Sequence, residues 1–458
     1  MTQRTTATVH NDASPVESFM VSAPGKVIVF GEHAVVYGKA AMAASISLRS
    51  YLHVQPGPLS PEPSITLDFV DIGLSHTWTT TSLPWSTFTS TASDLTTKPP
   101  PTTLDPALVS SLEPHITPIS PSLDPHTRKI HSSAASTFLY LFLLLSRPTS
   151  PSLTFTLRST IPIGAGLGSS ASISVCLATA LLHLNRTLSL PPSPSATAHA
   201  TLTTINALSF LGESLIHGTP SGVDNTVSTL GKAVVFQRLA PGQPPRIDTI
   251  RSFPELPLLV VDTKQPKSTS LEVSKVRLLR ERHPVVVEGI LDAIHGVTEE
   301  ARALITTVDA GKGASEVDGG SAEELVLRLG ELVTLNHGLL SALGTSHPRL
   351  EELRGSVERS GAGWFKLTGA GGGGCGFVLL RGETTDGEGR ERLRVLEDEL
   401  GQRGFEKYET SLGGDGVGIS LMEDGEITLG QFLAAKGTEG VQKLCGGERN
   451  RWRYWRFA

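Results

Sequence analysis

One short stretch restricts the possible folds of this chain more than any other: IPIGAGLGSSASISV, from Ile161 to Val175. The residues that lead into it, LTFTLRSTIPIG, alternate in polarity and predict a strand, whereas SSASISVCLATALLHL has the length and composition of a helix. We expect Ser169 or Ser170 to lie near the N-cap of that helix. The chain must therefore turn from a strand into a buried helix within a few glycine-rich residues.

The glycines of this turn, Gly164, Gly166 and Gly168, allow a sharp bend whose backbone N–H groups face outward. Unpaired N–H groups and the helix macrodipole both attract negative charge, so the turn predicts a phosphate site. It lacks the G-K-[ST] ending of a Walker loop and so supplies no lysine of its own. The alternative interpretation is a tight strand-to-helix turn that holds no ligand.

A second glycine run, KLTGAGGGGCGFVLL, extends from Lys366 to Leu380. It contains G-x-G-x-x-G at Gly369, Gly371 and Gly374, but these glycines lead into a strand-like segment. The dinucleotide-binding fingerprint must instead open a helix, so that interpretation fails. We expect a glycine loop that closes over a ligand, and a plain linker is the alternative.

The third motif, APGKVIVFGEHAVVYG, contains one lysine at the start of a predicted strand and a Glu-His pair just past its end. These residues are Lys26, Glu32 and His33. Each could be a solvated turn residue, but the glycines around them bring the backbone close to another group. We therefore treat all three as candidate site residues.

Two isolated carboxylates form the fourth feature. Between Asp124 and Asp248 the chain has only Glu213 and Asp224, both within FLGESLIHGTPSGVDNTVS. Glu213 belongs to a mostly apolar predicted helix over 205–217, and a lone carboxylate there is costly unless it is paired or binds a cation. We expect one metal ligand and one base; the alternative is a pair of structural acids, with Asp224 capping a helix.

Bulk properties exclude several classes of protein. The net charge of −6 over 458 residues lacks the basic excess that nucleic acids or membrane surfaces demand. The three cysteines are widely spaced, which argues against a disulfide framework or a zinc site. The most apolar run, FLYLFLLL, is too short for a bilayer and predicts part of a buried helix. We expect a cytoplasmic protein, since no signal pattern opens the chain.

Composition divides the chain into two parts. Residues before about 240 are poor in charge, those after about 265 are rich in Glu and Arg, and prolines break regular structure near 240–256. Strand-like and helical runs mix without βα alternation, which favours an α+β fold. We expect loops or disorder in residues 1–18, in much of 79–126 and in 186–199.

Together these motifs resemble the GHMP kinase superfamily and, within it, the mevalonate kinase family. The resemblance rests on APGKVIVFGEHAVVYG, PIGAGLGSSAS, KLTGAGGGGCG and GExxIHGxPSGVDN, and it extends from about Phe19 to Ser420. It implies two α+β domains with the active site in the cleft between them. We accordingly divide the chain into a disordered segment (1–18), an ATP-binding N-terminal domain (19–245) and a C-terminal domain (246–458).

The resemblance also implies roles for individual residues. Asp224 would be the base for the substrate hydroxyl, with Lys26 beside it, and Ser170 and Glu213 would bind Mg²⁺. The ATP phosphates would lie on the turn formed by Gly164, Gly166, Leu167, Gly168, Ser169 and Ser170. The mevalonate would contact Glu32, His33, Thr263 and Gly371, with Lys264 nearby. The product would be 5-phosphomevalonate, an early intermediate of isoprenoid and sterol synthesis.

Other implications of the resemblance concern assembly, regulation and rival functions. Relatives suggest a homodimer and feedback inhibition by prenyl diphosphates that compete with ATP. One departure is Ile173, which stands where a tyrosine is expected and alters the predicted nucleotide contacts. Two alternatives stay open, namely another GHMP small-molecule kinase and a catalytically silent regulatory protein, although Lys26, Ser170, Glu213 and Asp224 are all intact.

Overall fold

The computed structural model describes residues 16–88, 100–191, 195–239, 243, 245–251, 253–309, 322–381, 387–421, 427–446 and 452–456. Within these residues the strands form one thirteen-stranded sheet. Its main path runs β13-β12-β1-β2-β11-β8-β10-β9, and the remaining strands branch from β2 through β5 and β6. The mixed architecture confirms the predicted α+β class.

The strands are β1 (Phe19–Phe30), β2 (Ala40–Pro56), β3 (Ser64–Phe69), β4 (Leu74–Thr79), β5 (Leu153–Ser159), β6 (Ala233–Gln237), β7 (Arg246–Ile250), β8 (Leu256–Asp262), β9 (Gly363–Leu367), β10 (Cys375–Leu380), β11 (Glu406–Leu412), β12 (Gly418–Leu421) and β13 (Arg453–Tyr454). The helices are α1 (Pro106–Ile116), α2 (Pro125–Leu145), α3 (Ser169–Leu184), α4 (Ser195–His217), α5 (Val223–Leu230), α6 (Thr269–Arg282), α7 (Pro284–Asp309), α8 (Ala322–Ala342), α9 (Pro348–Ser360), α10 (Gly387–Gln402), α11 (Leu429–Ala434) and α12 (Gly437–Cys445). Three short 3₁₀ helices are η1 (Ala34–Tyr37), η2 (Val70–Ile72) and η3 (Thr80–Ser82).

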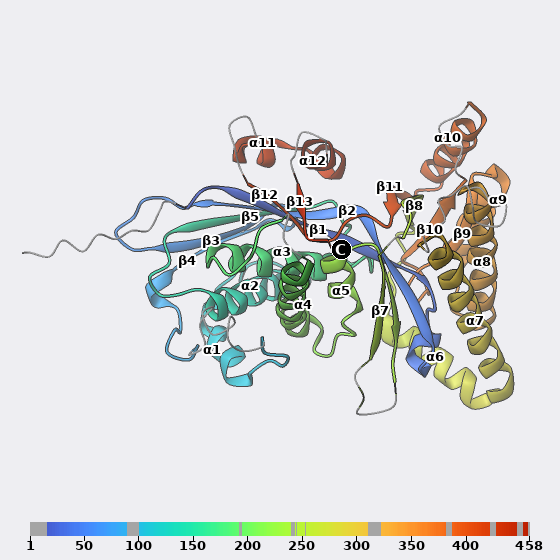
Figure 1. The fold of residues 1–458 in the computed structure, drawn as a ribbon, viewed down its shortest axis with the longest axis horizontal. Helices are drawn as coiled ribbons and strands as arrows, with labels where there is room; N and C mark the ends of the chain where they lie inside the picture. The colour runs from blue at the N-terminus through green and yellow to red at the C-terminus, as the bar shows by residue number, and fades with distance from the viewer. Residues whose placement is uncertain are drawn as a thin grey trace, which may run out of the picture.

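The long strand β2 joins the two parts of the molecule. It pairs antiparallel with β1, β5 and β6, and its residue Ile46 meets Leu412 of β11. Helices α1 to α5 lie beneath the first part of the sheet, whereas α6 to α10 cluster around β8 to β11 (Figure 1). The apolar run of α2 is buried as predicted, because it packs with α3, α4 and β5 in one core.

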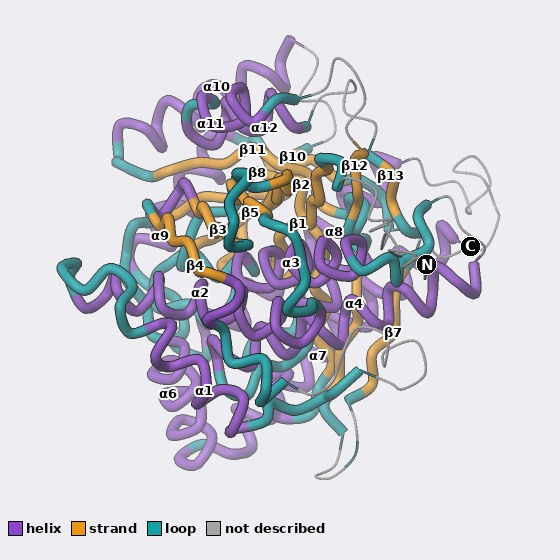
Figure 2. Tube along the Cα trace, turned by 90° about the vertical axis from the view of Figure 1, so that its left-hand side faces the viewer, coloured by secondary structure: helices purple, strands orange, loops and turns teal. Residues whose placement is uncertain are grey.

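The last part of the chain returns to the sheet of the first part. Strand β12 pairs with β1, and β13 pairs with β12. Helices α11 and α12 lie above the strands, on the side opposite α1 and α2, in both views (Figures 1 and 2). There Phe432, Val441 and Cys445 pack against Met20 and Tyr51. The domain division at 245/246 stays a prediction. The pairing of β12 with β1, and of β13 with β12, shows that the end of the chain also contributes to the sheet of the first part.

Part of the expected loop region is helical. Helix α1 occupies 106–116 because Pro106 follows an N-cap aspartate, Asp105, whose carboxylate accepts a hydrogen bond from the Ala107 N–H. Leu112 and Ile116 bury their side chains in the same core as α2, α3, α4 and β5. The loop prediction is therefore wrong for these residues. It is also wrong for residues 195–199 of the predicted loop 186–199, which form the start of α4. Residues 1–15, 89–99 and 192–194, which belong to the three predicted loops, lie outside the described residues.

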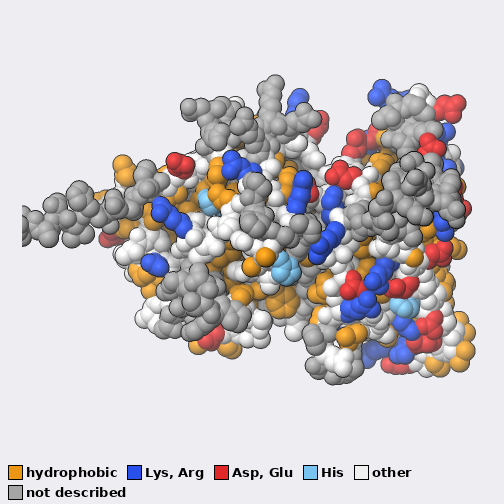
Figure 3. Space-filling view, viewed as in Figure 1, with side chains coloured by type: hydrophobic (Ala, Val, Ile, Leu, Met, Phe, Trp, Pro, Cys, Tyr) orange, Lys and Arg blue, Asp and Glu red, His pale blue; other side chains and the backbone are white. Residues whose placement is uncertain are grey.

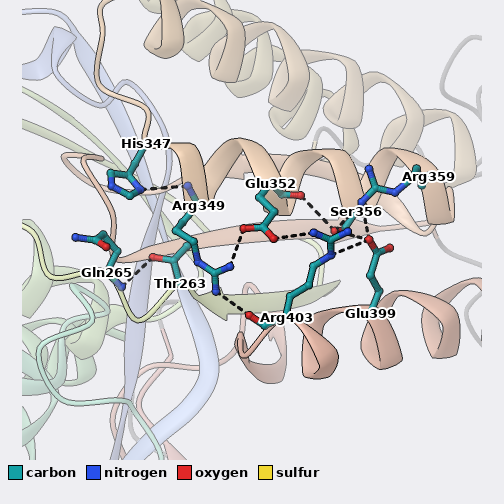
Figure 4. Close-up of polar contacts among 9 residues, drawn as sticks. All are labelled: Thr263, Gln265, His347, Arg349, Glu352, Ser356, Arg359, Glu399 and Arg403. Carbon is teal, nitrogen blue, oxygen red and sulfur yellow. Dashed lines mark hydrogen bonds and ion pairs between the residues drawn. The ribbon is translucent and has the colours of Figure 1, made fainter.

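Charged side chains concentrate on the second part of the molecule. On the face seen in Figure 3 they gather over α6 to α10, as the composition of the sequence predicts. Helices α9 and α10 are joined by ion pairs, in which Arg403 contacts both Glu352 and Glu399 at 2.7 and 3.0 Å (Figure 4). Such partly exposed pairs each contribute little to stability.

Candidate active site

A cavity of about 760 Å³ collects most of the predicted site residues. Its lining comes from both parts of the chain: β1, the turn before α3, and α4 and α5 on one side, and α6 and the second glycine loop on the other. The lining residues that the sequence predicts are Lys26, Glu32, His33, Gly164, Gly166, Leu167, Gly168, Ser169, Ser170 and Asp224. The described part of the structure thus brings together three motifs that are far apart in the sequence.

The glycine turn folds as predicted. Gly164, Gly166 and Gly168 have φ values of 74°, 80° and 76°, which residues other than glycine rarely adopt. Gly168 is the N-cap residue of α3, so Ser169 and Ser170 are its first two helical residues and lie near the N-cap as expected. The turn therefore presents the N-terminus of a buried helix, and both serine hydroxyls, to the cavity.

Lys26 lies directly beside this turn. Its backbone N–H donates to the Leu167 carbonyl at 2.8 Å, and its ammonium donates to the Gly166 carbonyl at 3.1 Å. The pairing of β1 with β2 shifts register between Pro24 and Lys26, and such an irregularity re-aims the side chain that follows it. The buried lysine is thereby fixed at the base of the turn.

Asp224 completes a pair with Lys26. Its Oδ2 lies 3.2 Å from Lys26 Nζ, and the aspartate side chain is 34% exposed whereas the lysine is 7% exposed. Gly222 is the N-cap residue of α5, and Asp224 is the second helical residue. The geometry therefore favours the ion-paired carboxylate over the capping alternative.

Glu213 lies close to Ser170 but in a more buried place. Burial raises the pKa of Glu213 to about 7; the charge of Asp224 acts in the same direction, whereas the Ser170 hydroxyl and Lys26 act against it. Among the described residues, its Oε1 atom is buried without a hydrogen-bond partner. A buried oxygen that lacks a partner beside a hydroxyl and an anion-binding turn fits a hard divalent cation.

Other donors at this point are few. The described residues contain no cluster of three or more His, Cys, Asp or Glu side chains suited to a metal. Mg²⁺ is usually held by one or two protein oxygens plus phosphate oxygens and water, so Ser170 and Glu213 would be sufficient ligands.

Lys267 is a cavity residue whose importance the sequence did not indicate. It belongs to VDTKQPKSTS, just before α6, and its Nζ would stand 3.3 Å from a Cβ added at Gly166 and 2.8 Å from one added at Gly374. The ammonium thus lies between the two glycine loops. Burial and, to a lesser degree, the charge of Lys26 lower the pKa of Lys267, although Cys375 and Asp262 raise it. An anion in the cavity would offset the free-energy cost of burying the charged Lys267 ammonium.

Glu32 and His33 are held by the second part of the chain. Glu32 forms a fully buried ion pair with Lys366 and accepts a hydrogen bond from the Asn336 amide at 3.1 Å. The Nε2 atom of His33 lies 2.8 Å from the Ala370 carbonyl, and burial lowers the pKa of this histidine. A neutral His33 therefore forms one wall of the cavity, with Glu32 behind it.

Thr263 and Gly371 lie apart from the lining residues. Thr263 donates to the Gly374 carbonyl at 2.7 Å and accepts from the Gln265 N–H at 3.3 Å (Figure 4). A Cβ at Gly371 would stand 2.1 Å from the Thr345 carbonyl oxygen. Within the described residues these two shape the second glycine loop, while Gly369 and Ala370 of that loop line the cavity. Lys264 pairs with Glu406 outside the cavity.

Part of the cavity lining is apolar. It includes Phe69, Ile72, Ile130, Ile163 and Ile216. Ile173, the residue that departs from the expected pattern, lines the cavity as well. The lining thus combines apolar side chains with cationic and glycine-rich segments, as a nucleoside triphosphate requires.

Comparison with known proteins agrees with this geometry. The family model described as "GHMP kinases N terminal domain" matches residues 132–232, and "GHMP kinases C terminal" matches residues 321–396. The fold and the site thus define a kinase of the GHMP class. A mevalonate kinase from Gibberella zeae is 51% identical over 96% of this chain and 87% of its own length. The human mevalonate kinase is 35% identical over 88% of this chain and 95% of its own length. The chain belongs to the mevalonate kinase family.

Solved structures support the same fold. The mevalonate kinase of Methanococcus jannaschii matches with a TM-score of 0.59 at 22% identity, covering 88% of this chain and 100% of that one. The Leishmania enzyme described as "L. major mevalonate kinase in complex with R-mevalonate" matches with a TM-score of 0.58 at 22% identity, covering 88% and 99%. No helix of the described residues has both the length and the apolarity to cross a membrane.

Proposed function

We propose that this protein transfers the γ-phosphoryl group of ATP to the 5-hydroxyl of (R)-mevalonate, which yields 5-phosphomevalonate and ADP. The observation that carries the proposal is the Lys26–Asp224 pair, 3.2 Å apart, beside a glycine turn at a helix N-terminus in a mevalonate kinase family member. The Leishmania relative with the same fold is described as bound to R-mevalonate. Phosphoryl transfer depends mainly on positioning and on neutralised charge, and this site supplies both.

The roles of the charged residues follow from their positions. Asp224 accepts the proton of the attacking hydroxyl, since its carboxylate is the more exposed member of the pair. Lys26 touches both Asp224 and the glycine turn, so its ammonium stabilises charge on the attacking oxygen and on the transferred group. His33 and Lys267 line the same cavity, and Lys267 offers a positive charge to an anionic substrate or phosphate.

In this proposal the nucleotide binds along the glycine turn. Its phosphates lie against the backbone N–H groups of the turn, and its base contacts the apolar lining residues, which include Ile173. Ser170 and Glu213 hold Mg²⁺, which neutralises phosphate charge when it is bound. A homodimer and inhibition by prenyl diphosphates stay predictions of the family resemblance, and a cytoplasmic location stays a prediction of the sequence pattern.

A substrate panel tests the proposal most simply. The protein is assayed with ATP, Mg²⁺ and one of mevalonate, phosphomevalonate, homoserine or galactose, and ADP release is followed. We expect mevalonate to be turned over with a kcat/KM at least 100-fold above the others, because a site built for one substrate discriminates strongly. Turnover of another member of the panel in place of mevalonate would contradict the proposal.

A further inference from the structure

His217 occupies a position that none of the roles above explains. It is the last residue of α4 and follows Glu213 by four residues, so both side chains lie on one face of the helix. Its Nε2 atom lies 3.2 Å from Ser170 Oγ and 3.9 Å from Glu213 Oε2. The imidazole, which lines the cavity, thus touches one proposed cation ligand and adjoins the other.

The chemistry of a serine ligand explains why such a neighbour is needed. A hydroxyl that coordinates a cation uses a lone pair, and its proton must then point toward an acceptor on another side. The Glu213 oxygen that would bind the same cation cannot also accept this proton. In the tautomer that carries its proton on Nδ1, His217 offers a free Nε2 lone pair at hydrogen-bond distance from Ser170.

We propose that His217 is a positioning residue for the cation site: it accepts the Ser170 O–H and so leaves the hydroxyl lone pairs free to face the cation that Ser170 and Glu213 would share. This inference rests on the proposed function, because the cation arrives with ATP. Residues that hold metal ligands in place typically contribute about 10- to 100-fold to metal affinity or activity. In this role His217 would hold Ser170 in place and would not itself bind the cation.

A purely structural role is the competing explanation. A histidine in the last turn of a helix can stabilise the helix through its dipole or through contact with Glu213. Loss of that role would lower the melting temperature and leave the effect of Mg²⁺ on nucleotide binding unchanged. The two explanations therefore differ in one measurable quantity, the gain in nucleotide affinity that Mg²⁺ produces.

The test compares four variants of the full chain. In His217→Gln the amide can reach the place of Nε2, whereas His217→Asn is too short and His217→Ala has no acceptor. His199→Ala is the matched control, because His199 is an exposed residue of the same helix outside the cavity lining. Calorimetry measures the affinity of a non-hydrolysable ATP analogue with Mg²⁺ and with EDTA, and a melting curve is recorded for each variant.

We expect His217→Ala and His217→Asn to reduce the Mg²⁺-dependent gain about 10-fold or more, with little change in metal-free affinity. His217→Gln should restore most of the gain, and His199→Ala should match the wild type. An unchanged gain in His217→Asn would overturn the inference, as would equal losses in the Gln and Asn variants. Should His217→Ala unfold, the Gln and Asn variants decide. A wild type that binds the analogue with Mg²⁺ but does not phosphorylate mevalonate would instead refute the proposed function.

Discussion

At the scale of single residues, Glu213 links the site to the stability of the protein. Its raised pKa, about 7 against an ordinary 4.5, means that the folded metal-free protein keeps a proton that the unfolded chain releases between these values. Stability must therefore fall as the pH rises through this window and level off above it. The full effect is roughly 3 kcal/mol, since a tenfold change in proton affinity corresponds to about 1.4 kcal/mol.

Glu213→Gln should remove this dependence because the amide does not ionise. We predict that, in EDTA, the variant gains stability relative to the wild type between about pH 5 and pH 8, by up to a few kcal/mol. Denaturant unfolding at both pH values measures the difference, and Glu331→Gln on exposed α8 surface is the control. A difference that does not vary with pH would show that Glu213 is not a buried, proton-holding carboxylate.

Lys267 gives a second prediction at this scale. Lys267→Ala should lower kcat/KM by about 10- to 100-fold, because charge-assisted hydrogen bonds to an anion contribute roughly 1.5–3 kcal/mol. The matched control is Lys264→Ala, three residues earlier, where the ammonium pairs with Glu406 away from the cavity. Equal kinetics of the two variants would exclude an anion-binding role for Lys267.

Some residues of the site could not be predicted from the sequence. His217 and Lys267 both stand within motifs that were recognised, yet only the fold brings them to the cavity. Glu32 was expected to contact substrate, but its partner Lys366 lies 334 residues further along the chain. A buried ion pair across that separation has no local signature, since neither residue changes the pattern around it.

At the scale of elements, the glycine turn is the part that depends most on backbone geometry. Gly164 and Gly168 both have positive φ, and so alanine costs roughly 1–2 kcal/mol of strain at either position. At Gly168 a Cβ would also stand 2.9 Å from Lys26 Cγ, whereas Gly164 has open space. The comparison of the two variants therefore isolates the contact with Lys26.

We predict that Gly168→Ala lowers kcat by at least about 10-fold more than Gly164→Ala, because a displaced Lys26 loses its alignment with Asp224. Melting temperatures, recorded in parallel, should fall by similar amounts for both variants if strain alone determines stability. Equal kcat values would mean that the fit between the turn and Lys26 is not required for turnover.

Local patterns predicted the elements around the first glycine turn. The sequence places the start of the helix after the glycine turn at Ser169, where α3 begins. The helix that carries Glu213 was expected over 205–217, but α4 begins ten residues earlier, at Ser195, because small and polar residues there still pack as a helix. Helix α1 was missed, since its prolines and serines are typical of loops, and it is stabilised by the Asp105 cap and by burial of Leu112 and Ile116.

At the scale of the whole molecule, the return of the chain to β1 is the feature that no local pattern indicates. Residues 427–446 cover the outer side of the sheet, and there Phe432 is completely buried. Phe432→Ala should destabilise the protein by about 3 kcal/mol or more, with kcat for the folded enzyme unchanged. Leu433→Ala, at a neighbouring residue that is 43% exposed, is the control. Equal unfolding free energies for the two variants would show that this segment is not part of the core.

The central claim is that Lys26 and Asp224 form the catalytic pair, and one variant tests it. Asp224→Asn keeps the size of the side chain but removes the base, so kcat for mevalonate should fall about 10²- to 10⁴-fold with little change in KM. The melting temperature should stay close to that of the wild type, because the Asp224 side chain is 34% exposed and asparagine keeps its shape. The measurement is kcat with saturating ATP, Mg²⁺ and mevalonate, recorded beside the melting curve. A folded Asp224→Asn protein with wild-type kcat would contradict the account.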